Sequence, residues 1–185
     1  MNSVLQLMRR GESLLAPSLD ARIDARLLLA HVLEKTIGAM TLFEDVPPKK
    51  EAEYLALLDR RRAGEPLQYI VSNAWFMGLS FYVDGRVLIP RQDSETLCEA
   101  ALELSKARGY KAALDLCCGS GAVALSLCIL GGLRVTATDI SKGALCVADI
   151  NAKKHGAPIE LLQGDLFCAL ERGRRFELIA CNPPY

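Results

Sequence analysis

The sequence has no excess of charge of either sign, because 22 Lys and Arg residues balance 22 Asp and Glu residues among its 185. Proteins that bind nucleic acid mainly through phosphate contacts usually carry a basic excess, so the composition argues against that class. The chain also lacks the run of about 18 apolar residues that a membrane-spanning helix needs. Arg9 and Arg10 interrupt the first apolar stretch, so we expect no signal peptide and a cytoplasmic protein.

Cysteine pairs at zinc-site spacing are missing as well. The seven cysteines are an odd number, and no two of them are separated by the two to four residues typical of structural zinc sites. Most of them lie in apolar stretches, so we predict buried, reduced thiols and no metal site. The cysteines are Cys98, Cys117, Cys118, Cys128, Cys146, Cys168 and Cys181.

The first part of the chain has a helical pattern. Residues 20–35 repeat apolar side chains every three to four positions, with Ser18 or Asp20 placed to cap the helix. Residues 51–62 form a second predicted helix, which Gly64 would end. We therefore predict a small all-α domain over residues 1–72. Its charges balance too, with ten residues of each sign up to residue 75.

The pattern then changes to alternating strands and helices. Residues 79–89 alternate in polarity and contain the turn signal Asp84-Gly85, so residues 73–90 are predicted to form a β-hairpin linker. Residues 91–185 follow with a parallel-sheet α/β pattern. The predicted helices there are 91–106, 122–130 and 141–155, and the predicted strands are 112–117, 134–139, 159–163 and 176–181.

A glycine-containing turn follows the first of these strands. Glycines allow a backbone turn to approach a ligand closely. A tight strand-to-helix turn needs such glycines in any case, so this pair is weak evidence when taken alone. The candidate ligand contacts in the turn are Asp115, Cys117, Cys118, Gly119, Ser120 and Gly121.

Acidic and aromatic residues follow the next two strands. Asp139 stands where nucleotide-binding folds place an acceptor for ribose hydroxyls, although it could instead cap the next helix together with Ser141. Phe167 could cover an adenine ring beside a carboxylate, or belong to the core. The candidate contacts at these strand ends are Asp139, Ile140, Asp165, Leu166 and Phe167.

The sequence Asn182-Pro183-Pro184-Tyr185 follows the fourth strand. The Asn182 side-chain oxygen and the backbone carbonyl of Pro183 are acceptors for a planar NH2 group, and Tyr185 would stack on that group. A simple proline-rich strand exit predicts neither the asparagine nor the aromatic residue. The motif therefore predicts methylation of a planar NH2 group.

In this order the motifs resemble those of class I S-adenosylmethionine methyltransferases. The Asn-Pro-Pro-Tyr form is similar to enzymes that methylate amino groups of adenine or cytosine, or the amide of glutamine. Residues 24–31, 62–70 and 87–95 resemble the release factor glutamine methyltransferases, also called PrmC or HemK. The resemblance covers nearly the whole chain, and four separated motifs agree.

The resemblance implies a Rossmann-like sheet that binds S-adenosyl-L-methionine, together with a helical domain that grips a peptide-chain release factor. The substrate would be the glutamine of a Gly-Gly-Gln motif, with no direct nucleic-acid binding and no membrane association. Asn182 would contact cofactor and substrate. The implied catalytic residues are Asn182, Pro183 and Tyr185, and the implied substrate contacts are Asn182, Pro183, Pro184 and Tyr185.

Two positions depart from the family pattern. The family usually has Gly where Cys117 stands, and often has Trp where Phe167 stands. Neither change removes a proposed ligand contact. His31 and His155 are predicted to be structural or solvated.

The segment at residues 91–95 and the end of the chain leave alternatives open. Arg91, Asp93 and Glu95 either line the site or serve the start of a helix, with Asp93 or Ser94 as its cap. The fold pattern stops after the fourth strand, so we expect a C-terminally incomplete domain with weak or no activity and dimerisation through that strand edge. The alternative functions are a nucleic-acid amino-methyltransferase and a non-catalytic binding module.

Overall fold

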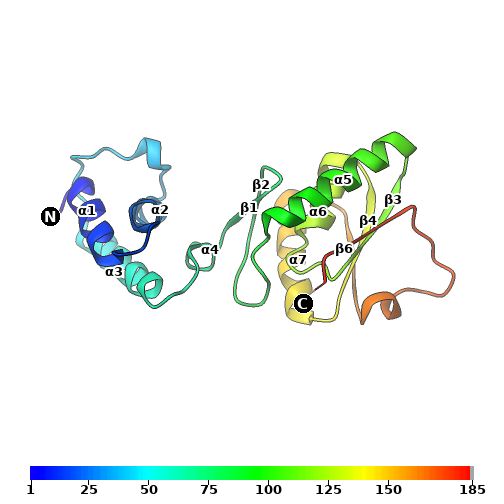
Figure 1. The fold of residues 1–185 in the computed structure, drawn as a ribbon. Helices are drawn as coiled ribbons and strands as arrows, with labels where there is room; N and C mark the ends of the chain where they lie inside the picture. Colours follow the sequence, from blue (N-terminus) through cyan, green and yellow to red (C-terminus); the bar gives the residue numbers. More distant parts are fainter. Residues whose placement is uncertain (184–185) are drawn as a thin grey trace. The chain divides into compact units, whose positions relative to one another are not determined.

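The computed structural model describes residues 1–183, and Pro184 and Tyr185 lie outside the described residues. The chain divides into two compact units, Met1–Val71 and a second unit that begins at Ser72 (Figure 1). None of the helices in the described part is long and apolar enough to cross a membrane.

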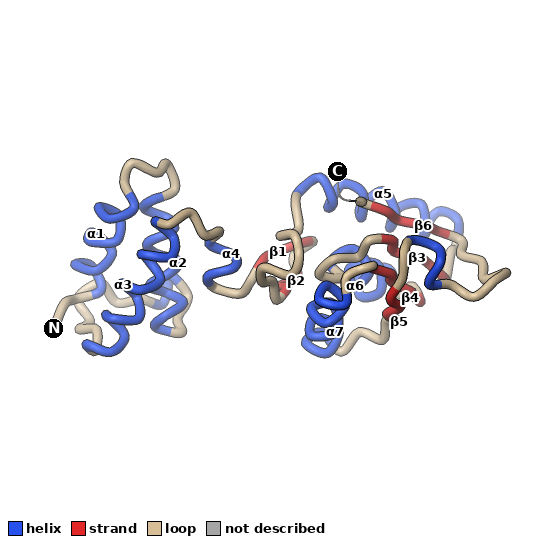
Figure 2. The backbone as a smooth tube through the Cα atoms, turned by 90° about the horizontal axis from the view of Figure 1, so that it is seen from below, coloured by secondary structure: helices blue, strands red, loops and turns tan. Residues whose placement is uncertain are grey.

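The first unit consists of helices joined by loops (Figure 2). Three main helices pack around a common core in which Leu7, Leu28 and Tyr54 are fully buried. The helices are α1 (Val4–Leu15), α2 (Ala21–Leu33), α3 (Pro48–Arg62) and the short α4 (Leu67–Ile70), with the 3-10 turn η1 (Ile37–Ala39).

The predicted helices at 20–35 and 51–62 are confirmed as α2 and α3. Their predicted boundaries are partly wrong. Asp20 has φ −92° and ψ 0°, not the extended conformation of a capping residue, and its side chain makes no cap hydrogen bond. The Ser18 hydroxyl instead accepts from the Asp20 N–H at 3.3 Å. Pro48 opens α3, where a missing N–H costs nothing.

Buried polar contacts join the helices of this unit. The Tyr54 hydroxyl lies 3.1 Å from the Ala25 carbonyl oxygen and 3.3 Å from that of Leu7. Burial raises the pKa of Tyr54, so this hydroxyl remains a donor. Gly11 leaves room for it, because a Cβ there would lie 1.9 Å from the hydroxyl oxygen. The Arg61 guanidinium donates to Asp24 at 2.7 Å, which joins α3 to α2.

The second unit begins with a small antiparallel hairpin of β1 (Ala74–Phe76) and β2 (Leu79–Phe81). Its turn is Met77-Gly78, with φ of 50° and 73°. The predicted hairpin turn at Asp84-Gly85 is therefore wrong. Those residues form a separate turn within the loop after β2, in which the Val87 N–H donates to the Asp84 carbonyl at 3.1 Å. A two-residue hairpin loop of type I′ has two consecutive positive φ values, as Met77-Gly78 does, whereas the φ of Gly85 is not positive.

A four-stranded parallel sheet forms the rest of this unit, in the order β5-β4-β3-β6. The predicted α/β class and the predicted parallel sheet are confirmed. Helix α6 packs between α5 and α7 and against β3 and β4. The strands are β3 (Ala112–Leu116), β4 (Arg134–Asp139), β5 (Glu160–Gln163) and β6 (Leu178–Cys181); the helices are α5 (Gln92–Arg108), α6 (Ala122–Gly131), α7 (Lys142–His155) and the 3-10 turn η2 (Leu166–Ala169).

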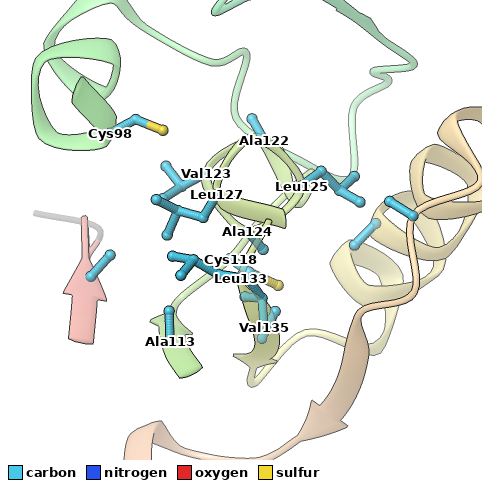
Figure 3. Close-up of a cluster of buried hydrophobic side chains, with 14 of the residues drawn as sticks. Cys98, Ala113, Cys118, Ala122, Val123, Ala124, Leu125, Leu127, Leu133 and Val135 are labelled. Atoms are coloured by element: carbon cyan, nitrogen blue, oxygen red, sulfur yellow. The ribbon is translucent and has the colours of Figure 1, made fainter. Parts of the chain in front are cut away.

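The core of this unit lies around α6. Figure 3 shows Val123 and Leu127 of α6 pointing into the space between Cys98 of α5 and Ala113 of β3, while Leu125 lies on the other side of the helix. Among the cysteines, Cys98 and Cys118 are buried, as predicted. The prediction is wrong for three others, which are exposed: Cys146, Cys168 and Cys181.

Candidate active site

The turn between β3 and α6 has a left-handed backbone at three positions. Cys117, Gly119 and Gly121 have φ of 60°, 54° and 78°. Two features require glycine at position 121. Its φ lies in the left-handed region, and a Cβ there would lie 3.1 Å from the Ala148 Cβ. Cys117 has a conformation that glycine adopts freely but that residues with a side chain, apart from asparagine and aspartate, rarely adopt. The bulkier residue noted in the sequence is therefore accommodated at the expense of backbone strain.

Asp139, at the end of β4, binds this turn directly. One carboxylate oxygen accepts from the Gly119 N–H at 2.9 Å, and the other accepts from the Ser141 N–H at 2.9 Å. The Ser141 hydroxyl caps α7 by accepting from the Ala144 N–H at 3.2 Å. A carboxylate has about four acceptor positions, so Asp139 can organise both loops and still accept from a ligand hydroxyl. The alternative role of Asp139 as the cap of this helix is wrong, because Ser141 is the N-cap residue.

Asp115 lies beneath the turn and is 3% exposed. One of its oxygens accepts from the Ala124 N–H of α6 at 3.0 Å. Burial raises the pKa of Asp115 to about 7, the Ala124 hydrogen bond opposes that rise, and the Asp139 charge adds to it. Asp115 therefore supports the turn from below and carries an unusually basic carboxyl group.

The segment after β5 lies beside the end of β4. The Gly164 N–H donates to the Asp139 carbonyl at 3.1 Å, and the Thr138 hydroxyl donates to the Leu166 carbonyl at 3.5 Å. Phe167 is 55% exposed and Ile140 is 69% exposed, so the alternative assignment of Phe167 to the core is wrong. The predicted residues at the two strand ends are thus near one another, with apolar side chains open to a ligand.

Asn182 is placed by the pairing of β6 with β3. Leu116 and Cys181 are register partners, so Asn182 follows β6 at the level where Cys117 follows β3. Its side-chain N–H donates to the hydroxyl of Ser94 on α5 at 2.7 Å. Asn182 and Pro183 are exposed. The predicted roles of Pro184 and Tyr185 concern residues outside the described part.

A cavity of about 90 Å³ lies between the glycine turn, the loop before α5 and Asn182. Apolar lining comes from Phe76, Leu88 and Ile89. The predicted site residues that line it are Arg91, Asp115, Cys117, Cys118, Gly119, Ser120 and Asn182. The predicted residues that are not in its lining are Asp93, Glu95, Gly121, Asp139, Ile140, Asp165, Leu166, Phe167 and Pro183.

The polar residues at the start of α5 make different contacts. Arg91 is the N-cap residue and makes no capping hydrogen bond through its side chain, so the predicted cap by Asp93 or Ser94 is wrong. Glu95 accepts from the Met77 N–H at 2.6 Å and so secures the hairpin turn. Ser94 is 8% exposed and lines the cavity. The interpretation of Ser94 as a cap missed this placement.

Asn151 of α7 is a buried site residue that sequence patterns did not single out. Its side-chain oxygen accepts from the Tyr82 N–H at 2.7 Å. Its nitrogen donates to the carbonyls of Tyr82 at 3.0 Å and Ser120 at 2.9 Å. The side chain therefore connects the loop after β2 to the glycine turn. A polar residue on the inner face of α7 was the only sequence signal.

Two family matches cover most of the chain. Residues 6–71 match the PrmC N-terminal domain, and residues 94–185 match the methyltransferase small domain. Among solved structures, the T. thermophilus 16S rRNA N2 G1207 methyltransferase in complex with AdoMet and guanosine aligns with a TM-score of 0.53 at 25% identity, over 61% of this chain and 32% of that one. The P. abyssi tRNA (uracil-54, C5)-methyltransferase has a TM-score of 0.50 at 16% identity, over 60% of this chain and 28% of that one, and supports the fold alone.

Similar curated proteins share one name. The release factor glutamine methyltransferase of Bordetella pertussis is 41% identical over 89% of this chain and 62% of its own length. The protein of that name from Moorella thermoacetica is 44% identical over 89% of this chain and 59% of its own length. The chain thus spans about three fifths of the length of these relatives. With a PrmC N-terminal domain followed by a methyltransferase small domain, the chain belongs to the release factor glutamine methyltransferase family.

Proposed function

We propose that this chain transfers a methyl group from S-adenosyl-L-methionine to the side-chain amide nitrogen of the glutamine in the Gly-Gly-Gln motif of a peptide-chain release factor. The observation that carries the proposal is the position of Asn182. It follows β6 beside the glycine turn, lines the same cavity as Cys117 and Gly119, and has its side-chain nitrogen engaged by Ser94. Its side-chain oxygen remains as an acceptor for a planar NH2 group.

The residues at the carboxyl edge of the sheet fit the cofactor. The left-handed turn at Gly119 and Gly121 exposes backbone that a ligand can approach closely, Asp139 retains acceptor positions for ribose hydroxyls, and Phe167 is open to stack on a base. When bound there, S-adenosyl-L-methionine supplies a methyl group on a sulfonium. These contacts would hold it next to Asn182.

The work left to the protein is mainly placement. An amide nitrogen is a poor nucleophile because its lone pair is delocalised, and correct positioning of two reactants contributes roughly 7–11 kcal/mol. The Asn182 side-chain oxygen and the Pro183 carbonyl would each accept one hydrogen of the substrate NH2. Their partial negative charges would also favour the positive charge that develops on that nitrogen. The methylated nitrogen then releases its proton to water, so no side chain is assigned as the base.

The helical unit supports a protein substrate. It matches the PrmC N-terminal domain, and its ten basic and ten acidic residues cancel. We propose that this unit contacts the release factor. A nucleic-acid substrate is the second candidate, favoured by the likeness to the rRNA methyltransferase of T. thermophilus. A domain that holds RNA would usually carry a basic surface, and this neutral unit argues for the protein substrate.

The test incubates the protein with S-adenosyl-L-methionine and either a release factor or an RNA oligonucleotide, followed by mass spectrometry. We expect one added methyl group, on the Gly-Gly-Gln glutamine. Asn182→Ala should lower transfer by roughly 10²-fold or more while cofactor affinity, measured by calorimetry, stays largely intact. Asp139→Ala is the contrasting variant and should weaken cofactor binding itself. Methylation of the oligonucleotide alone, or equal loss of binding and transfer in Asn182→Ala, would contradict the proposal.

A further inference from the structure

The first turn of α5 contains a buried side chain that bonds to Asn182. The Ser94 hydroxyl is 2.7 Å from the Asn182 side-chain nitrogen, although the two residues are 88 positions apart. Ser94 is 8% exposed and lines the cavity, whereas Asn182 is exposed. The buried Ser94 hydroxyl thus binds the side chain of Asn182, which is otherwise exposed to solvent.

We propose that Ser94 is a positioning residue for methyl transfer, which fixes the Asn182 amide with its oxygen turned toward the substrate. This inference rests on the function proposed above and adds a residue to it. Ser94 need not touch the substrate or the cofactor, because it acts through the orientation of Asn182.

The physical reason is the asymmetry of the asparagine amide. Its two ends have nearly the same shape, but one accepts hydrogen bonds and the other donates them. Rotation of the amide by half a turn would present an NH2 group to the substrate NH2 group, so a donor would face a donor. With its nitrogen bound to Ser94, Asn182 keeps its oxygen for the substrate. The Ser94 hydroxyl could also donate to a rotated amide, but only the observed orientation satisfies both Ser94 and the substrate NH2 group. Without that bond, water would hydrate the exposed amide in several orientations.

Helix α5 provides a matched control. Ser105 is also buried, at 4% exposure, and its hydroxyl donates to the Ala101 carbonyl at 2.7 Å. Ser105→Ala removes the same atom from the same helix, but this hydroxyl bonds to Ala101 and not to Asn182, and Ser105 is outside the cavity lining. A loss caused only by a weaker α5 should appear in both alanine variants.

The kinetic experiment measures methyl transfer to a release factor in wild type, Ser94→Ala, Ser94→Thr and Ser105→Ala. In Ser94→Ala we expect kcat to fall roughly 10- to 100-fold, because a misplaced group costs up to about 10²-fold, with cofactor affinity within about twofold of wild type. Ser94→Thr retains the hydroxyl and should recover most of kcat. Ser105→Ala should keep wild-type kcat. An unchanged kcat in Ser94→Ala, or no rescue by threonine, would overturn the inference.

A second readout observes Asn182 itself, by the NMR signals of its side-chain NH2 group. In wild type and Ser94→Thr we expect slow hydrogen exchange at this group, and in Ser94→Ala faster exchange. If the release factor is not methylated while the NMR signals respond as expected, the proposed function fails and the Ser94 contact stands. If transfer occurs but neither signals nor kcat respond to Ser94→Ala, the positioning role fails and the proposed function stands.

Discussion

Two buried aspartates, one in each unit, differ in their partners. Asp24 in the helical unit is 5% exposed and receives a hydrogen bond from the Arg61 guanidinium at 2.7 Å. Asp115 in the second unit is 3% exposed and accepts from a backbone N–H, and the described residues include no ion pair to it. The first carboxylate is compensated by charge, and the second is not.

The buried polar side chains also connect different kinds of element in the two units. In the helical unit, Asp24 and Tyr54 join helices to one another. In the second unit, Asp115 joins β3 to α6, and Asn151 and Ser94 join helices to loops at the carboxyl edge of the sheet. Buried polar groups therefore connect helices to one another in the first unit and support the residues around the site in the second. The four predictions below test this contrast.

The largest effect is expected from Asp115. Its pKa is raised to about 7 in the folded chain, so the protonated form is favoured there, whereas the unfolded chain loses this proton near its ordinary value of 3.8. Stability from this group is therefore complete below about pH 4 and falls as the pH rises to about 7. The full change is on the order of 4 kcal/mol. Asp115→Asn should remove it, as measured by urea unfolding at several pH values.

Asp84 gives the control of opposite sign. Hydrogen bonds from Arg86 hold the pKa of Asp84 below its usual range, so its contribution is present above the ordinary pKa and lost in acid. Asp84→Asn should change the unfolding profile below about pH 4 and leave the window between pH 4 and 7 as it is in wild type. A wild-type slope in Asp115→Asn would remove the distinction between the two buried aspartates.

The next effect is expected from Asn151. Asn151→Ala leaves the N–H and carbonyl of Tyr82 and the carbonyl of Ser120 without this partner, which should cost about 3 kcal/mol in the free energy of unfolding. Cofactor affinity should fall as well, because the glycine turn loses a support. Lys153→Gln, on the exposed side of the same helix, is the control and should leave both quantities unchanged. Retained cofactor affinity in Asn151→Ala would show that the turn holds its shape without Asn151.

The helical unit should respond to Arg61→Met. This change leaves Asp24 buried without its cation, which should cost about 2 kcal/mol, a value below that of a fully buried pair because Arg61 is partly exposed. Faster hydrogen exchange of backbone amides in α2 and α3 would report it. The neighbouring Arg60 pairs with Glu65 at the surface, so Arg60→Met should cost less than about 1 kcal/mol. Equal costs would contradict the contrast between buried and surface pairs.

The smallest effect is a gain in stability from Cys117→Gly. Cys117 has φ of 60°, a conformation that costs a non-glycine residue roughly 1–2 kcal/mol. Glycine also raises the entropy of the unfolded chain, which offsets about 0.4–1 kcal/mol of that relief, so the free energy of unfolding should rise by up to about 1 kcal/mol. Cys118 is the control, since it is buried without a left-handed backbone. Cys118→Gly should therefore destabilise. A loss of stability in Cys117→Gly would mean that its thiol contributes more than the strain costs.

The sequence predicted the parts of the fold that depend on local patterns. The strands of the parallel sheet and the helices α6 and α7 lie within two residues of their expected positions, because apolar runs and glycine turns mark them. The hairpin turn was missed, since Met77-Gly78 lacks the Asn-Gly or Asp-Gly signal that Asp84-Gly85 carries. The tertiary packing, not the strongest local signal, selects the turn.

The candidate site was predictable only where residues adjacent in sequence act together. The glycine turn, Asp139 and Asn182 could be named because each follows a recognisable strand. The contacts of Ser94 with Asn182 and of Asn151 with Tyr82 span 88 and 69 positions. No local pattern encodes such a distance, so the supporting residues became visible only in the folded chain.

The pairing of β6 with β3 also determines where this chain can tolerate insertions and deletions. Side chains alternate between the faces of a strand, so one residue added between Leu178 and Asn182 would turn Asn182 away from Ser94 and the cavity. The loop at residues 170–177 precedes the strand and can change length at small entropic cost. Length variation among natural or designed variants should therefore gather in that loop and stop at Leu178.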